Sequence, residues 1–125
     1  MYRDLKVYQS AMELCVVVYR ITTGFPRIER FGLVSQMRRA AVSVSSNVAE
    51  GAERHSLKEQ LRFYYIARGS IAELETQLDL SQRLGYICQS SVKITNETYQ
   101  LLNGLIRSVK YRIKQQAASN KQQAT

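Results

Sequence analysis

The side chains that could act as a catalytic base are few in this sequence of 125 residues. Nucleophilic catalysis needs a nucleophile, a neighbouring base and a third group that orients the base. Several serines and Cys15 are available as nucleophiles, but His55 is the one histidine and it falls in an expected turn. We interpret His55 as a solvated turn residue, and the sequence predicts a protein that is not an enzyme.

Metal and nucleotide motifs are also missing from the sequence. A di-iron site in a helical bundle needs inward glutamates with Glu-x-x-His pairs, and no such pair occurs. With one histidine and two cysteines, Cys15 and Cys88, the sequence has too few residues at ligand spacing to form a zinc site. Neither Gly-x-x-x-x-Gly-Lys nor Gly-x-Gly-x-x-Gly is present to hold phosphates. We expect no metal and no cofactor.

Basic residues are the remaining candidates for chemistry. The net charge of +8 permits binding to a polyanion without requiring it. From Thr98 onward the chain carries five basic residues and no acid. Arg107, Lys110 and Lys114 share one helix face by their spacing, whereas Arg112 points elsewhere. The same pattern fits a solvated basic helix end, because cations are favourable at a helix C-terminus. The candidate nucleic-acid-binding residues are Arg38, Arg39, Arg107, Lys110, Arg112 and Lys114.

Helical periodicity accounts for most of the chain. Apolar residues recur every three or four positions, as in Met37, Ala41, Val44 and Val48. Helices are expected over residues 5–22, 33–54, 57–84 and 91–115. Ser56–Glu59 (SLKE) fits a capping box, which predicts the start of the third helix. The residues expected to face inward on the last helix are Tyr99, Leu102, Ile106, Val109 and Ile113. Short turns between the helices favour antiparallel neighbours. The sequence predicts an all-α fold, an antiparallel up-down-up-down four-helix bundle over residues 1–115, with a polar, disordered tail at 116–125.

The first helix contains an unbroken apolar run, Leu14–Tyr19. A helix that is apolar all round is expected to be buried on two sides, so we expect a subunit interface on its second side. The alternative is that some of these β-branched residues are simply exposed. The run is far shorter than the ~20 residues that span a bilayer. With no signal-peptide pattern and no disulfide framework, we expect a cytoplasmic protein without a membrane partner.

Two linked segments carry a family resemblance. Phe25–Ser43 (FPRIERFGLVSQMRRAAVS), running into Ser46–Gly51 (SNVAEG), resembles the four helix bundle family of 23S rRNA-intervening sequence proteins. Ala67–Leu78 (ARGSIAELETQL) is similar to the third helix of the same family. The resemblance implies a bacterial, non-enzymatic bundle. Related accessory proteins of diversity-generating retroelements form five-fold rings that bind nucleic acid and a reverse transcriptase, so the resemblance also implies a homopentamer.

The polar and glycine residues of these segments are expected to be structural. We expect the polar members to pair in buried positions between helices or subunits, and to set their register, rather than to contact RNA. Mid-helix Gly69 is expected to allow close contact with another backbone. One of Arg38 and Arg39 is expected to pair with Glu73 or Glu75. The structural residues are Asn47, Glu50, Gly51, Gly69 and Glu73.

Two functions remain open on the sequence. The first is an oligomeric bundle that binds RNA or another nucleic acid through its basic residues. The alternative is a protein-interaction scaffold whose oligomer recruits a partner protein, with the charge serving solubility or steering. Tyr64 and Tyr65 could stack on bases, but we expect them in the core.

Overall fold

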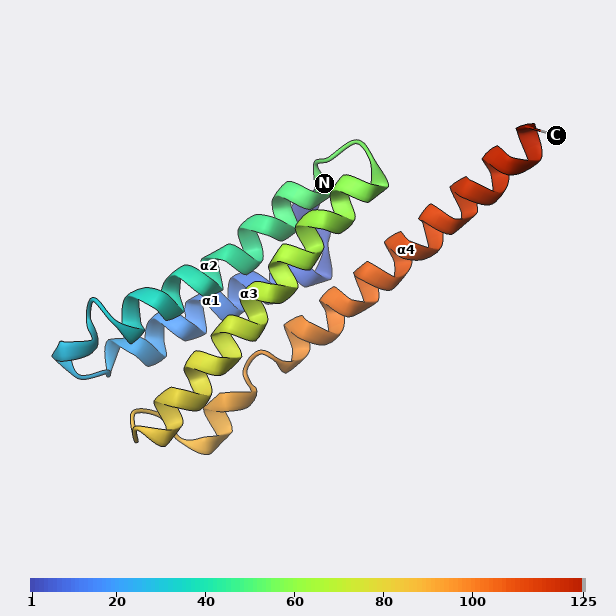
Figure 1. Cartoon of the computed structure of the whole chain (residues 1–125). Helices are drawn as coiled ribbons and strands as arrows, with labels where there is room; N and C mark the ends of the chain where they lie inside the picture. The colour runs from blue at the N-terminus through green and yellow to red at the C-terminus, as the bar shows by residue number, and fades with distance from the viewer. Residues whose placement is uncertain (125) are drawn as a thin grey trace.

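The chain folds into four α-helices, seen in a computed structural model that describes residues 1–124 (Figure 1). A short 3-10 turn at Tyr2–Asp4 precedes the first helix, and two more, at Arg27–Glu29 and Gln89–Lys93, lie in the first and last connections. No strand occurs in the described part. The all-helical, four-helix prediction is confirmed. The helices are α1 (Lys6–Thr23), α2 (Leu33–Ala52), α3 (Leu57–Arg83) and α4 (Asn96–Ala124).

The helices α2 and α3 form a closely packed antiparallel pair. Ser43 Oγ lies 2.8 Å from Ser70 Oγ near the middle of the pair. Closer to the start of α2, Met37 Sδ accepts a hydrogen bond from Ser81 Oγ at 3.5 Å. The contacts therefore move backward along α3 as they move forward along α2. Gly51 makes this packing possible, because a Cβ there would lie only 2.6 Å from a ring carbon of Tyr64.

The helix α4 closes the bundle against α1 and α3. Ser10 Oγ lies 2.7 Å from Thr98 Oγ1, a buried contact that joins α1 to α4. Arg68 of α3 donates to Asn103 Oδ1 at 3.1 Å. Figure 1 shows α4 running beside α3 and then beyond the end of the other helices.

The core contains the apolar face predicted for α2. Met37, Ala41, Val44 and Val48 are all fully buried. The inward face predicted for α4 is correct at Leu102, Ile106 and Val109, which are buried. It is wrong at Tyr99, which is 38% exposed because it lies on the outer edge of the helix.

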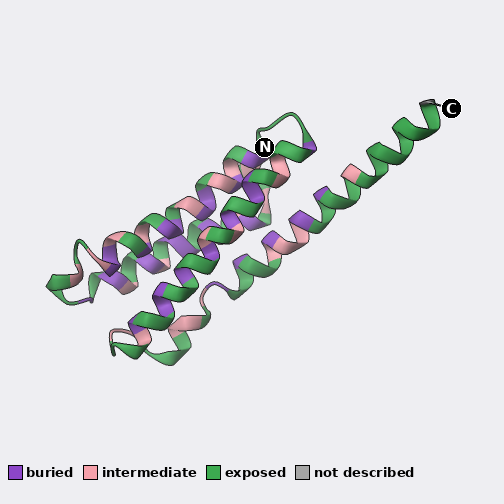
Figure 2. Ribbon diagram, in the orientation of Figure 1, coloured by how far each residue is buried: buried purple, intermediate pink, exposed green. Residues whose placement is uncertain are grey.

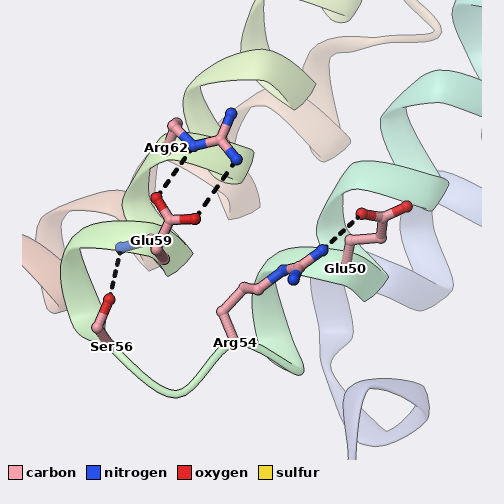
Figure 3. Close-up of polar contacts among 5 residues, drawn as sticks. All are labelled: Glu50, Arg54, Ser56, Glu59 and Arg62. Atoms are coloured by element: carbon pink, nitrogen blue, oxygen red, sulfur yellow. Dashed lines mark hydrogen bonds and ion pairs between the residues drawn. The ribbon is translucent and has the colours of Figure 1, made fainter.

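The turn between α2 and α3 is fixed by the predicted cap. Ser56 Oγ accepts a hydrogen bond from the Glu59 backbone N–H at 3.1 Å (Figure 3). In a complete capping box the Glu59 carboxylate would accept a hydrogen bond from the Ser56 backbone N–H. Here the carboxylate accepts from Arg62 instead. At the other end of α3, Gly85 has a φ of +83°, which only glycine adopts without strain. These two positions define both ends of α3.

The helix α4 is longer at its C-terminus than predicted. It runs to Ala124, through most of the segment for which the sequence predicts disorder, and Thr125 lies outside the described residues. Its side chains from Lys114 to Gln123 are exposed (Figure 2). Alanine, glutamine and lysine are good helix formers, and extending an existing helix avoids the cost of nucleation. The last turns of α4 therefore continue without packing against other helices.

Within residues 1–124, no helix combines the length and the hydrophobicity that crossing a membrane requires.

The two cysteines lie in opposite environments. Cys15 is buried on α1, where it donates to the Ala41 carbonyl at 3.1 Å, and burial raises the pKa of its thiol. Cys88 is exposed before the third 3-10 turn, with its Sγ 3.0 Å from Ser90 Oγ and 3.4 Å from Ser91 Oγ. Hydrogen bonds from these hydroxyls stabilise the thiolate and lower the pKa of Cys88 to about 7.

The glycines of α2 and α3 should respond oppositely to alanine. At Gly51 the new Cβ would also lie 3.0 Å from Phe63 Cβ, so the Tyr64 ring or the helices must move. We expect Gly51→Ala to lower the free energy of unfolding by ~1–3 kcal/mol. Gly69 has no atom within 4 Å of the position of a Cβ, so the expected backbone contact there is absent within the chain. Gly69→Ala should stabilise by about 1 kcal/mol, since alanine is the better helix former. Urea unfolding of both variants checks the pair, and equal losses would contradict the packing described here.

The cysteines should differ in reactivity with iodoacetamide. Because the pKa of Cys88 is lowered to about 7, its alkylation rate should rise through that pH and level off above it. Cys15 should stay unmodified in the folded chain. Replacing both Ser90 and Ser91 by alanine should move the midpoint up, toward the ordinary thiol value of about 8.5. Mass spectrometry of peptides over a pH series measures both rates, and an unmoved midpoint would rule out this hydroxyl effect.

Candidate nucleic-acid interface

The six basic residues predicted to bind nucleic acid lie in three separate places. Arg38 and Arg39 lie on α2 near its connection to α1, which Figure 1 places at the end of the bundle opposite to the α4 C-terminus. Arg107, Lys110 and Lys114 lie together on one face of α4, and Arg112 lies on another. The structure thus brings together three of the six.

The α4 group forms a continuous basic face. Arg107, Lys110 and Lys114 are exposed, and none has an ion pair within residues 1–124. Lys121 follows two helical turns after Lys114, on the same face. Asn103, which is bonded to Arg68, precedes Arg107 by one turn on this face. The basic face therefore borders the line of contact between α4 and α3.

Side chains of α3 extend this surface in a way that the sequence did not predict. The Arg68 guanidinium lies 5.0 Å from the centre of the Tyr65 ring. Tyr65 is 38% exposed, whereas Tyr64 is in the core as expected. An exposed tyrosine beside an arginine can stack on a base while the arginine contacts phosphate. Periodicity alone could not find this pair, because it does not say which side of α3 meets α4.

A cleft of about 440 Å³ continues the surface toward the end of the bundle. The α2–α3 turn supplies one wall and the last third of α4 supplies the other. Lys58 lies on the first wall, close to exposed His55. Its lining residues are His55, Ser56, Leu57, Lys58, Ile113, Gln116, Ala117 and Asn120. We define the α3–α4 basic seam as Lys58, Arg68, Arg107, Lys110 and Lys114.

Two acids on either side of the α2–α3 turn are paired with nearby arginines. Glu59 accepts from Arg62 at 3.1 Å, and Glu50 accepts from Arg54 at 3.1 Å (Figure 3). The hydrogen bond from Arg62 lowers the pKa of Glu59, so this carboxylate is ionised and held by its neighbour. Both pairs are exposed and contribute little to stability. The pairing of Glu59 with Arg62 offsets the one carboxylate that follows Lys58 of the seam directly in sequence.

Arg112 belongs to a different surface. It lines a smaller cleft with Tyr2 and Leu5, which precede α1, and with Ala52 at the end of α2. Burial raises the pKa of Tyr64, and the charge of Arg112 opposes that rise. Arg112 is therefore close to the bundle end and separate from the seam.

Arg38 acts at the C-terminal end of α1. Its Nε donates to Thr22 Oγ1 at 2.9 Å and its Nη2 donates to the Tyr19 carbonyl at 3.3 Å. Its guanidinium also lies 4.5 Å from the centre of the Tyr19 ring. A cation is favourable beside the free carbonyls of a helix end. Arg39 is exposed, and neither arginine makes the expected pair with Glu73 or Glu75 in the described chain.

The structural residues divide into two groups. Asn47 donates to the Ser43 carbonyl at 2.8 Å and to Ser43 Oγ at 3.0 Å, and Ser43 then contacts Ser70. This chain of polar contacts links α2 to α3. Glu50 and Glu73 are exposed, so the expected buried pairing within the chain does not hold for them.

No group of three metal-ligating side chains occurs in the part of the chain that the structure describes. Residues 3–108 match the model of a family described as 23S rRNA-intervening sequence protein. A crystal structure from Bacteroides thetaiotaomicron, described as a protein of unknown function from the S23 ribosomal protein family, has a similar fold. It is 21% identical, with a TM-score of 0.75 over 86% of this chain and 99% of that one. A comparison with curated proteins finds no match.

Proposed function

Because the chain belongs to the 23S rRNA-intervening sequence protein family, we propose that it binds RNA, and that the α3–α4 basic seam is the surface that does so. The observation that carries the proposal is the unpaired face of Arg107, Lys110 and Lys114. These cations are spaced to follow a phosphate backbone, which is the general source of affinity for nucleic acids. We assign the protein no catalytic role, and we propose a bacterial, cytoplasmic setting on the same family membership.

The seam combines two kinds of contact. Its lysines and arginines would bind phosphates without reading sequence. Tyr65, exposed beside Arg68, would supply a stacking surface for an unpaired base. This combination favours RNA with single-stranded loops or ends over a continuous duplex.

We also propose that the chain is a homo-oligomer, with the pentamer implied by its resemblance as the first expectation. Supporting this, two residues one turn apart on α1, Met12 and Val16, are 41% and 45% exposed. β-branched residues are poor choices for a solvated helix face. Contiguous apolar surface of this kind is typical of subunit contacts.

A second candidate function uses the same apolar surface. The oligomer would be a scaffold that recruits another protein, with the positive charge steering an acidic partner toward it. Co-purification from a bacterial lysate with and without nuclease separates the two functions. Partners that are all lost on nuclease treatment support RNA binding, whereas a protein partner that persists supports the scaffold.

Removing the charges of the seam should weaken RNA binding and its salt dependence together. For Arg107→Gln, Lys110→Gln and Lys114→Gln combined, the slope of log K against log salt should fall by about 2 to 3, since each phosphate contact contributes 0.7 to 0.9. Fluorescence anisotropy with a labelled RNA hairpin between ~50 and ~200 mM salt measures the slope.

The matched control removes three arginines at the other end of the bundle. Arg27→Gln, Arg30→Gln and Arg39→Gln combined lower the net charge by the same amount, so a loss caused by net charge alone would appear in both variants. We expect the control to retain most of the affinity and slope. Equal losses in the two variants would reject the seam as the binding surface.

The apolar face of α1 should control oligomer size. Val16→Glu introduces a carboxylate whose burial in an apolar contact is costly, so the oligomer should dissociate toward chains of 14.3 kDa. Tyr111→Glu, which alters an exposed aromatic residue of α4, is the control and should leave the mass unchanged. Analytical ultracentrifugation measures both, and a wild-type protein that sediments as a single chain would contradict the proposal.

A further inference from the structure

The connection between α1 and α2 is held rigidly from its inner side. Glu29 accepts hydrogen bonds from the Leu33 backbone N–H at 3.3 Å and from the Tyr86 hydroxyl at 3.0 Å. The bond to Glu29 raises the pKa of Tyr86, which therefore stays protonated as the donor. Phe25 is buried, with its ring 5.2 Å from that of Tyr86. The one acid of the connection is thus engaged by neighbouring groups, and the turn has a fixed shape.

The outer side of the same connection is apolar and basic. Ile28 is 85% exposed and Phe31 is 88% exposed, the two largest values among the large apolar residues of the described chain. Arg27 and Arg30 alternate with them and are exposed, and neither has an ion pair in the described chain. The Arg30 guanidinium lies 5.5 Å from the centre of the Phe31 ring.

Two clefts lie beside this connection, with volumes of about 500 and 350 Å³. Both are lined by Arg30, Val34 and Arg38. The larger adds Val42 to the apolar lining and Arg39 to the charged lining, with Phe31 along one side. The larger cleft thus has valine side chains within it and arginines around it. We define the arginine turn surface as Arg27, Ile28, Arg30, Phe31 and Arg39.

We propose that the arginine turn surface docks an acidic segment of a partner protein that carries an exposed apolar side chain. The apolar side chain would enter the larger cleft, against Val34 and Val42. Carboxylates on either side of it would bind Arg27, Arg30 and Arg39. Guanidinium groups bind carboxylates through two parallel hydrogen bonds, which gives both energy and orientation. An apolar centre with arginines and an aromatic residue around it is the usual composition of a protein interface.

The composition favours a protein segment over RNA. The lining contributed by Val34 and Val42 offers no donor or acceptor to a base edge, and exposed Ile28 contributes nothing to phosphate binding. The basic residues of this surface are all arginines, whereas the α3–α4 basic seam also contains lysines. The net positive charge selects an acidic partner. The two basic surfaces therefore differ in chemistry as well as in position.

Synthetic peptides test the proposal directly. The probe is a fluorescein-labelled peptide of alternating Glu, Asp and Ser with one central Leu, and binding is measured by fluorescence anisotropy. Two matched peptides replace either the Leu by Ala or the acids by Gln and Asn. Each replacement should weaken binding by at least about fivefold, because the cleft and the arginines each recognise one feature. A peptide that binds equally well without its Leu would overturn the proposal.

Variants of the protein locate the site. Two variants should each lower the affinity for the peptide by about fivefold or more. The first is Phe31→Ala, and the second combines Arg27→Gln, Arg30→Gln and Arg39→Gln. The combined Arg107, Lys110 and Lys114 variant should bind the peptide as the wild type does, so that failure of this proposal is distinct from failure of RNA binding. Since Phe31 is 88% exposed, its replacement should not unfold the chain, and thermal unfolding checks this.

Two other occupants would each overturn the assignment. If a single-stranded oligonucleotide of equal charge binds more tightly than the peptide and depends on Phe31, the surface binds nucleic acid. If Phe31→Ala reduces the mass measured by sedimentation, a second copy of this chain covers the surface. If the combined Arg27, Arg30 and Arg39 variant and the combined Arg107, Lys110 and Lys114 variant lose the same affinity for the peptide, binding reflects only general charge attraction, which would also overturn the assignment.

Discussion

The close approach of α2 and α3 at Gly51 is the constraint on which the rest of the bundle depends. Without a side chain at Gly51, the Tyr64 ring lies against the α2 backbone, and the contact of Ser43 with Ser70 follows from the same register. A shift of either helix would separate all of these groups at once. Because α1 packs on α2 and α4 packs on α3, this pair also determines where the outer helices lie.

The sequence predicts much of the fold because periodicity and caps are local signals. The buried face of α2 and the cap at Ser56 follow from spacing and residue type, and both are confirmed. The helical extension of α4 was missed, because low complexity resembles disorder while the same residues propagate a helix. The pairing of Arg68 with Asn103 could not be predicted either. The sequence shows which residues share a helix face, but it does not show which neighbouring helix that face contacts.

The candidate site shows the same limit in its charges. Counting basic residues identified Lys110 and Arg39 as equally available, yet they lie on different surfaces. Arg38 is partly engaged by the end of α1 through Thr22, a role that its position beside Arg39 in the sequence does not reveal. The net charge indicates how strongly the whole protein attracts a polyanion, but it does not locate the binding surface. Spacing in the sequence placed Arg107, Lys110 and Lys114 on one face, whereas the packing of α3 against α4 was needed to place Arg68 beside them.

The contact between Ser10 and Thr98 has a consequence for the order of folding. These residues are separated by 88 positions, so closing this contact restricts a long stretch of chain, whereas α1, α2 and α3 meet through neighbours in sequence. Local contacts form faster than distant ones. We therefore expect the contact between α1 and α4 to form last during folding. Because α4 is the last of the four helices, the surface shared by α3 and α4 exists only after these late residues have been synthesised.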